Sequence, residues 1–170
     1  IRDLRKVGGL LTIMPISITI TVITALSMAG VPPFNGFLSK EKFLEAMIDV
    51  THANLMSLST LGFIFPIIAI VGSIFTFVYS IKFIMHIFFG KYKPESLPQS
   101  AHESSILMLL SPIILALLVI AFGLFPSILT QSIIEPATQS VSQSTGITAE
   151  FHLFHGITPA FISTMAIYII

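Results

Sequence analysis

The sequence predicts an all-α protein, a polytopic transmembrane helix bundle with one discontinuous helix, and three observations lead to this prediction. Hydrophobic residues make up 54% of the chain and charged residues 9%, whereas soluble domains carry about 25% charged residues. Long apolar blocks alternate with short polar connections, as in a chain that crosses a membrane several times. Finally, glycine and proline interrupt one of these apolar blocks.

The first apolar block predicts a broken transmembrane helix over residues 8–53. The residues that interrupt it are Gly30, Pro32, Pro33, Asn35 and Gly36. Because proline lacks a backbone donor and clashes with the preceding turn, the helix cannot continue through them. In a bilayer such a break is tolerated only where the freed backbone groups face protein or a water-filled cavity. We therefore expect a functional site at the break, and Lys40 just beyond it is the first candidate.

Three further apolar blocks predict transmembrane helices at residues 61–89, 105–134 and 151–170. Each approaches or exceeds the roughly 20 residues that a helix needs to cross the hydrocarbon core. After Ser111 the middle block carries few polar side chains, so we expect it to face lipid or to pack passively. Because the sequence starts without Met and ends in an apolar run, we expect residues 1–170 to form a single membrane-embedded segment of a larger chain.

The basic residues indicate how often residues 8–53 cross the membrane. Lys and Arg accumulate in cytoplasmic loops. The basic residues outside the predicted helices are Arg2, Arg5, Lys6, Lys91 and Lys93. A single discontinuous crossing places all of them on one side, whereas two short crossings would divide them three against two. We therefore predict one crossing, with the N-terminus and residues 90–104 in the cytoplasm, in a multi-pass protein of the cytoplasmic membrane.

Lys40 occupies an apolar face of the helix that follows the break. Because helical residues advance by about 100° each, Lys40 shares this face with Phe43, Leu44 and Met47. The other charged residues of the helix lie on the opposite side, where they could pair with one another: Glu41, Lys42, Glu45 and Asp49. Two interpretations of Lys40 stay open. It could snorkel to lipid headgroups, or it could carry protons in a hydrated pocket, where desolvation readily neutralises an ammonium group.

Other polar side chains within the predicted spans are candidates for an ion pathway. Lys82 and His86 are one helical turn apart, and such a pair could pass protons because histidine titrates near neutral pH. They could equally anchor the cytoplasmic end of their helix. Ser17, Thr21 and Thr24 share one face of the first span and could line a file of water molecules. Helical hydroxyl groups also bond to carbonyls of their own helix, which is the commoner arrangement.

The sequence gives no support to several other classes of function. Without cysteine, the chain has no disulfide, no thiol nucleophile and no cysteine-based metal site. A net charge of zero gives no indication of nucleic-acid binding. His52, His102, His152 and His155 lack a second strong ligand at a metal-binding spacing, so we expect no metal and no cofactor. No motif of a hydrolase, kinase or dehydrogenase is present, so we expect a transporter segment and not an enzyme.

One stretch of the sequence closely resembles a known family. The residues ALSMAGVPPFNGFLSKEKFLEA, at positions 25–46, resemble the discontinuous-helix signature of the antiporter-like subunits shared by respiratory complex I and Mrp-type cation/proton antiporters. The upstream stretch LRKVGGLLTIMP is similar to the same family's lead-in. Within the family the large A subunit of Mrp antiporters is the best match, through its carboxy-terminal half and the stretches VGSIFTFVYS, FFGKYKPE, QSAHES and LFHG.

The resemblance implies that the chain is part of a membrane subunit that moves protons in exchange for Na⁺, in a complex with other membrane subunits in the lipid bilayer. Such subunits contain two related helical units, each with a broken helix and a lysine. Lys40 matches the lysine of the second unit, whereas the pattern gives no role to Lys82 or His86. Two alternatives remain. One is a proton-translocating membrane subunit of NADH-quinone oxidoreductase (complex I), with its redox chemistry in other subunits. The other is a structural scaffold segment of such a complex.

Overall fold

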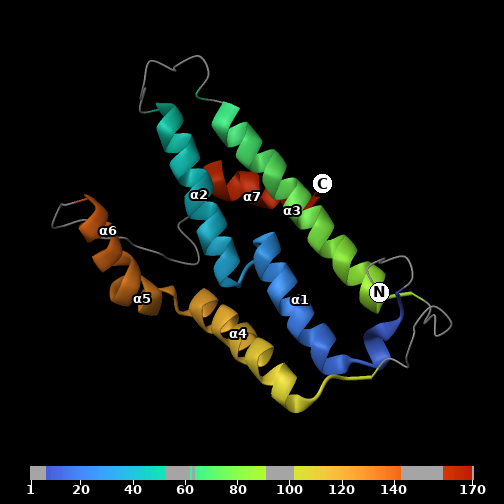
Figure 1. Ribbon diagram of the computed structural model, residues 1–170. Coiled ribbons are helices and arrows are strands. Elements are labelled where there is room, and N and C mark those ends of the chain that lie inside the picture. The colour runs from blue at the N-terminus through green and yellow to red at the C-terminus, as the bar shows by residue number, and fades with distance from the viewer. Residues whose placement is uncertain (1–6, 53–61, 63, 91–101, 143–158, 170) are drawn as a thin grey trace.

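Helices account for every regular element in the computed structural model, which describes residues 7–52, 62, 64–90, 102–142 and 159–169 (Figure 1). In chain order they are the 3₁₀ turn η2 (Leu10–Thr12), α1 (Pro15–Ala29), α2 (Asn35–His52), α3 (Ile64–Phe88), α4 (Ile106–Leu124), α5 (Pro126–Leu129), the π-helical turn η5 (Thr130–Ile134), α6 (Glu135–Ser142) and α7 (Pro159–Ile169). Over the described residues, the predicted fold class, an all-α bundle with a discontinuous helix, is confirmed, because residues 30–34 separate α1 from α2.

The two halves of the discontinuous helix, α1 and α2, follow one another in the same general direction (Figure 1). α3 returns in the opposite direction and contacts both halves. α4 also contacts α1 and α2, and α7 packs on α2 and α3. Because the chain does not turn back at the break and one continuous helix borders both pieces, this arrangement supports the prediction of a single discontinuous crossing.

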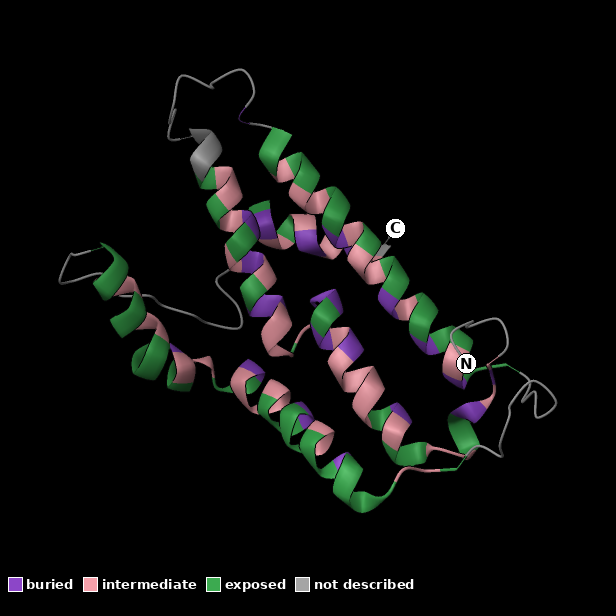
Figure 2. Ribbon diagram, viewed as in Figure 1, coloured by how far each residue is buried: buried purple, intermediate pink, exposed green. Residues whose placement is uncertain are grey.

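Side chains are buried where the helices meet and exposed along the outer faces of α3 and α4 (Figure 2). A hydrophobic cluster joins η2 and α1 to α3, and its buried members are Leu10, Ile18, Ala25, Ile84 and Phe88. On the outer face of α4, Leu107 is 84% exposed. Among the described residues, α3 and α4 are long and apolar enough to cross a membrane, whereas α1 and α7 are shorter apolar helices. Such large exposed apolar faces fit contact with lipid.

The predicted span 105–134 is divided in two. α4 ends at Leu124, and Phe125 adopts a non-helical backbone conformation with φ −123° and ψ 66°. Pro126 then begins α5, which continues through η5 into α6. Proline suits the first position of a helix because its missing N–H would have no helical partner there. The membrane limits of all the predicted spans stay predictions, and residues 151–158 of the last span lie outside the described residues.

The N-terminal part of the chain and the segment before α4 meet at one end of the bundle. The Gly9 N–H donates to the Phe89 carbonyl at 3.3 Å. The Glu103 carboxylate accepts hydrogen bonds from the N–H groups of Ile16 (2.9 Å) and Ser17 (3.4 Å), and from the Ser17 hydroxyl. This proximity agrees with the prediction that both segments face the same side of the membrane. The basic residues behind that prediction lie outside the described residues: Arg2, Arg5, Lys6, Lys91 and Lys93.

Glu103 caps the amino end of α1 as a charged group. The pKa of the Glu103 carboxyl lies below its ordinary value, mainly because the Ser17 hydroxyl donates a hydrogen bond to it. Backbone N–H groups, including those of Ile16 and Ser17, lower the pKa further, and together these bonds outweigh the opposing effect of desolvation. A carboxylate is also favoured near a helix N-terminus by the helix dipole. The carboxylate therefore ties the segment before α4 to the start of α1.

We expect Glu103→Gln to lower the melting temperature of the complete protein by a few degrees at neutral pH. A carboxyl group whose pKa is lowered by folding stabilises the folded state above its unfolded pKa, and this contribution is lost as the pH falls through the folded value. The difference in Tm should therefore shrink as the pH falls below the ordinary glutamate pKa of 4.5. Thermal unfolding at a series of pH values checks this, with Glu135→Gln in α6 as the control. A difference in Tm that stays constant with pH would contradict the ionic cap.

Candidate functional site

A local backbone arrangement at Gly30 ends α1. Gly30 adopts a left-handed conformation with φ 84°, which glycine reaches without a steric penalty. Its N–H donates to the Ser27 carbonyl at 2.9 Å, and the Val31 N–H donates to the Leu26 carbonyl at 3.0 Å. These are the paired hydrogen bonds of a Schellman motif, which commonly ends helices at glycine. The end of α1 is thus determined by the local sequence.

Several carbonyl groups lose their helical partners at the break, and those of Ala29 and Gly30 are adjacent. A continued helix would pair the Ala29 carbonyl with the N–H of residue 33, but Pro33 has no N–H. It would pair the Gly30 carbonyl with the Phe34 N–H, which donates instead to the Val31 carbonyl at 3.2 Å. Buried backbone acceptors need other donors when the helix cannot supply them. The break therefore creates two adjacent acceptors inside the bundle.

Two polar side chains supply the missing donors. Lys40, in the second turn of α2, donates from Nζ to the Ala29 carbonyl at 2.9 Å. Tyr168, near the end of α7, donates its hydroxyl to the Gly30 carbonyl. A Cβ added to Gly30 would lie 2.7 Å from Lys40 Cδ, so the lysine stem lies directly against this glycine. The lysine and the tyrosine thus bind consecutive carbonyls of the same break.

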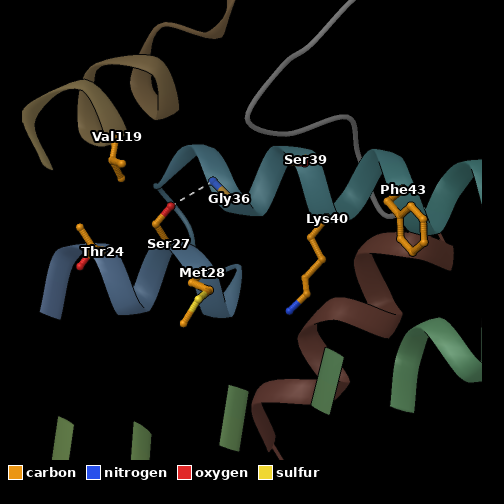
Figure 3. A pocket seen from close by; sticks show the side chains of 8 residues that line it. All are labelled: Thr24, Ser27, Met28, Gly36, Ser39, Lys40, Phe43 and Val119. Atoms are coloured by element: carbon orange, nitrogen blue, oxygen red, sulfur yellow. Dashed lines mark hydrogen bonds between the residues drawn. The ribbon is translucent and has the colours of Figure 1, made fainter. Parts of the chain in front are cut away.

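Ser27 joins the two halves of the discontinuous helix. Its hydroxyl accepts a hydrogen bond from the Gly36 N–H at 3.2 Å, which Figure 3 shows, and it donates to Asn35 Oδ1 at 2.8 Å. The Gly36 N–H belongs to the first turn of α2, where backbone donors have no helical partner. A Cβ on Gly36 would lie 1.9 Å from the Ser27 carbonyl oxygen, so the close approach of α1 and α2 requires glycine here.

The carboxyl end of α4 packs on the break. A Cβ on Gly123 would lie 2.1 Å from the Pro33 carbonyl oxygen and 2.8 Å from the Asn35 nitrogen. Backbone therefore meets backbone at this point, which a larger residue would prevent. The buried Gly123 of α4 admits the chain between α1 and α2, and the expectation that this span faces lipid or packs passively stays a prediction.

An open cleft of about 510 Å³ lies beside Lys40, with walls from α1, α2 and α4. Figure 3 shows the Lys40 side chain extending from α2 past Met28 at the end of α1. The polar residues that line the cleft are Thr24, Ser27, Ser39 and Lys40. The other walls are largely apolar, from Met28, Phe43 and Val119, so water in the cleft would find its hydrogen-bonding partners at these four polar residues. Lys40 therefore has a fixed carbonyl acceptor and room for water close by.

The charged residues of α2 do not all lie on the side that helical spacing predicts. Glu41 is 5% exposed, although the spacing places it on the polar side of the helix. It belongs to the same buried stripe as Phe37 and Leu44, which are each 1% exposed. α7 covers this stripe, because the Phe161 ring meets the Phe37 ring edge to face with centres 6.4 Å apart. The Glu41 carboxylate is consequently turned inward, where it interacts electrostatically with Tyr168.

The remaining charged candidates lie away from the Lys40 cleft. Lys42 and Glu45 form an ion pair at 2.8 Å, as their spacing predicted. Lys82 and His86 are exposed on α3, and His86 Nδ1 lies 2.9 Å from the Lys82 carbonyl oxygen of its own helix. Neither lines the cleft. Among the described residues, no group of three His, Asp or Glu side chains could hold a metal ion.

The three hydroxyl candidates of α1 have helical or capping partners. The Thr21 hydroxyl donates to the Ser17 carbonyl at 2.7 Å, and the Thr24 hydroxyl donates to the Ile20 carbonyl at 2.9 Å. The Ser17 hydroxyl donates to Glu103 at the end of the bundle. Of these three, Thr24 alone lines the cleft beside Lys40. The structure thus brings Thr24 close to the break and leaves Ser17 and Thr21 farther along α1.

Sequence reasoning missed Tyr168 and Glu103. Tyr168 stands in an apolar run, where a buried tyrosine hydroxyl needs a hydrogen-bonding partner, and this need was the available signal. Glu103 is an acidic residue just before an apolar block, which is typical of a helix cap or of a loop. Neither pattern indicates which group the side chain binds, because both residues bind segments that are far away in the sequence.

Known proteins share this sequence and this arrangement. Residues 1–66 match the family described as NADH:quinone oxidoreductase/Mrp antiporter, transmembrane. A Staphylococcus epidermidis protein named Na(+)/H(+) antiporter subunit A1 is 81% identical over 99% of this chain, which spans 21% of that protein's length. Proteins of the same name from Staphylococcus haemolyticus and Staphylococcus aureus are 76% and 73% identical, with the same coverage.

The fold gives an independent comparison. The solved structure of the Mrp complex from a Dietzia species contains a similar chain, with a TM-score of 0.70 and 26% sequence identity over 96% of this chain and 16% of that one. The resemblance of the PPFNGFLSKE stretch is therefore accompanied by similarity along nearly all of the chain and by a common fold. Nearly all of this membrane-embedded chain is thus similar to one part of the Mrp antiporter A subunits, and residues 1–66 match the NADH:quinone oxidoreductase/Mrp antiporter family.

Proposed function

We propose that this chain is part of a membrane subunit that moves protons in exchange for Na⁺ within a multi-subunit complex, and that Lys40 carries the proton. The observation behind the proposal is the hydrogen bond from Lys40 Nζ to the Ala29 carbonyl. A snorkelling lysine would extend its ammonium to the headgroups, whereas this ammonium is bound to the backbone of the break. The names of the Staphylococcus relatives support Na⁺ and H⁺ as the exchanged ions.

The surroundings of Lys40 suit a group that gains and loses a proton. The carbonyl dipole of Ala29 favours the charged ammonium, while removal from water favours the neutral amine. These effects oppose each other, so a modest change in hydration or in the geometry of the break can shift the balance. The cleft beside Lys40, with the hydroxyls of Thr24, Ser27 and Ser39, offers water a place beside the amine.

The other candidate residues have different parts in this proposal. Thr24 lines the cleft and belongs to the proposed proton path. Ser17 and Thr21 lie along the same helix toward Glu103, on the route by which protons would enter from that end. Lys82 and His86 are exposed on α3, a position that supports anchoring of the helix and not proton transfer to Lys40.

A place in NADH-quinone oxidoreductase is the second candidate function, because the matching family model covers both kinds of complex. The relatives that are 73–81% identical are named antiporter subunits, and this favours the first candidate. A scaffold role is the third candidate, and the exposed apolar faces of α3 and α4 support it because they offer broad surfaces for neighbouring subunits. Substitutions of Lys40 separate the scaffold role from the two transport roles.

Lys40→Arg in the complete complex tests the proposal. Arginine keeps the positive charge but does not release its proton. The variant therefore loses a role in carrying protons but keeps a role that needs only a fixed positive charge. We expect Na⁺-dependent proton movement in membrane vesicles to fall at least about tenfold, with the amount of assembled complex unchanged. Lys42→Arg, which keeps the ion pair with Glu45, is the matched control and should transport normally. Normal transport by Lys40→Arg would show that Lys40 is not a proton carrier.

A further inference from the structure

Tyr168 binds the break from outside the discontinuous helix. Its hydroxyl donates to the Gly30 carbonyl, although the two residues are 138 positions apart. Its ring packs on Phe77 of α3, with ring centres 5.3 Å apart. A tyrosine ring held by another ring has few orientations open to it, so α3 and α7 together determine where the hydroxyl lies.

α7 is held in place along its length. Ala160, Thr164 and Ile167 are 2%, 0% and 2% exposed, and they recur at the spacing of one helix face. Near the start of α7, Phe161 meets Phe37 of α2 edge to face. α7 contacts both α2 and α3. Because α7 is packed near both of its ends, these contacts hold the Tyr168 hydroxyl beside the break.

We propose that Tyr168 is a positioning residue for Lys40, an inference that rests on the proposed role of Lys40 as the proton carrier. The carbonyls of Ala29 and Gly30 are adjacent among those that the break frees, and Tyr168 donates to that of Gly30. The ammonium of Lys40 is thereby confined to the carbonyl of Ala29.

The consequence of losing the Tyr168 hydroxyl follows from the position of Lys40. A Cβ on Gly30 would lie 3.5 Å from Lys40 Nζ, so the ammonium is already close to this residue. Without the tyrosine hydroxyl, the Gly30 carbonyl becomes a second acceptor for the ammonium. A neutral amine gains less from a carbonyl than an ammonium does. Lys40 would then hold its proton more firmly, and proton release would need a higher pH.

The other ionisable groups around the break do not account for the expected shift in the pH profile. Glu41 on α2 is the buried charge that interacts with Tyr168, and Tyr168→Phe retains this carboxylate. α1 and α4 carry no ionisable side chain. The remaining ionisable side chains that are described on α2 and α3 are at least partly exposed: Lys42, Glu45, Asp49, Tyr79, Lys82 and His86. A shift in the pH profile of a Tyr168 variant therefore reports on the hydroxyl.

Tyr168→Phe in the complete complex tests the inference, because phenylalanine keeps the ring against Phe77 and removes only the hydroxyl. We expect Na⁺-dependent proton movement to fall about fivefold to tenfold at the pH optimum of the unmodified complex. The pH profile of the remaining transport should move to higher pH. Tyr79→Phe is the matched control: Tyr79 is exposed on α3 and its hydroxyl meets Met28 Sδ at 3.5 Å. This variant should keep both the rate and the profile.

The pH profile is normalised to the maximum of each variant, so it remains informative even when less complex assembles. An unchanged profile and a normal rate in Tyr168→Phe, alongside an inactive Lys40→Arg, would overturn the role of Tyr168 and leave the proposed function standing. Normal transport by Lys40→Arg would overturn both. A reduced rate with an unchanged pH profile would make Tyr168 a structural residue and would also overturn the inference.

Discussion

Lys40→Ala should abolish Na⁺/H⁺ exchange by the complete complex while leaving its assembly intact. A positioned proton-transfer group contributes about 10²–10⁴-fold to a rate, so we expect a loss of at least about a hundredfold. The Ala29 carbonyl that loses its partner lies near the open cleft, where water can replace the ammonium. The break should therefore keep its shape. Dissipation of a pH gradient by vesicles after addition of Na⁺ measures the activity, and the amount of purified complex measures assembly.

Lys42→Ala is the matched control for this experiment. Lys42 is two positions away on the same helix and forms a partly exposed ion pair with Glu45. Such pairs contribute little to stability, so this variant should transport at nearly the normal rate. Equal activity in Lys40→Ala and Lys42→Ala would remove Lys40 from the mechanism and would favour the scaffold role.

Gly123→Ala should destabilise the protein strongly, because the added methyl group has no space. Its Cβ would lie 2.1 Å from the Pro33 carbonyl oxygen, which is backbone and cannot rotate away as a side chain can. Overpacking costs about 1–3 kcal/mol in typical cores, and we expect a loss of unfolding free energy at the upper end of this range. The yield and the Tm of the purified complex should both fall, and transport should fall with them.

Gly72→Ala provides the comparison. Gly72 lies within α3, and a Cβ there meets nothing within 4 Å in this chain. Because alanine is more favourable than glycine inside a helix by about 0.5–1 kcal/mol, this variant should be at least as stable as the unmodified protein. If Gly123→Ala were as stable as Gly72→Ala, α4 would not pack closely on the break.

Local chemistry made the broken helix predictable. Gly30, Pro32 and Pro33 impose the same backbone restrictions in any surroundings, so the sequence alone indicates where the helix stops and that Lys40 follows soon after. Which side of α2 is buried was harder to predict than the position of the break. Spacing assigned Glu41 to the polar side, but α7 covers that stripe, and which helix covers a face depends on contacts from elsewhere in the chain.

Contacts over long sequence separations could not be predicted from patterns. Tyr168 and Gly30 are 138 positions apart, and Glu103 and Ile16 are 87 apart. A hydrophobic pattern indicates that one face of a helix is buried, but it does not indicate which other segment of the chain packs against that face. The interruption at Phe125 had a local signal in Pro126, but the apolar run around it predicted a continuous span.

The length of α1 has a consequence for how the proposed proton carrier should respond to the membrane potential. A helix of 15 residues is about 22 Å long, and the Glu103 carboxylate marks its amino end. The hydrocarbon core is about 30 Å thick, so with the amino end of α1 at one surface of the core, a proton that reaches Lys40 from that end has passed about three-quarters of it. Moving one elementary charge across the whole core involves about 2.3 kcal/mol per 100 mV. Proton exchange with Lys40 from the Glu103 side would therefore involve about 1.7 kcal/mol per 100 mV, and exchange with the opposite side about 0.6 kcal/mol per 100 mV. If Lys40 is the proton carrier that we propose, its two half-reactions are expected to be driven unequally by voltage.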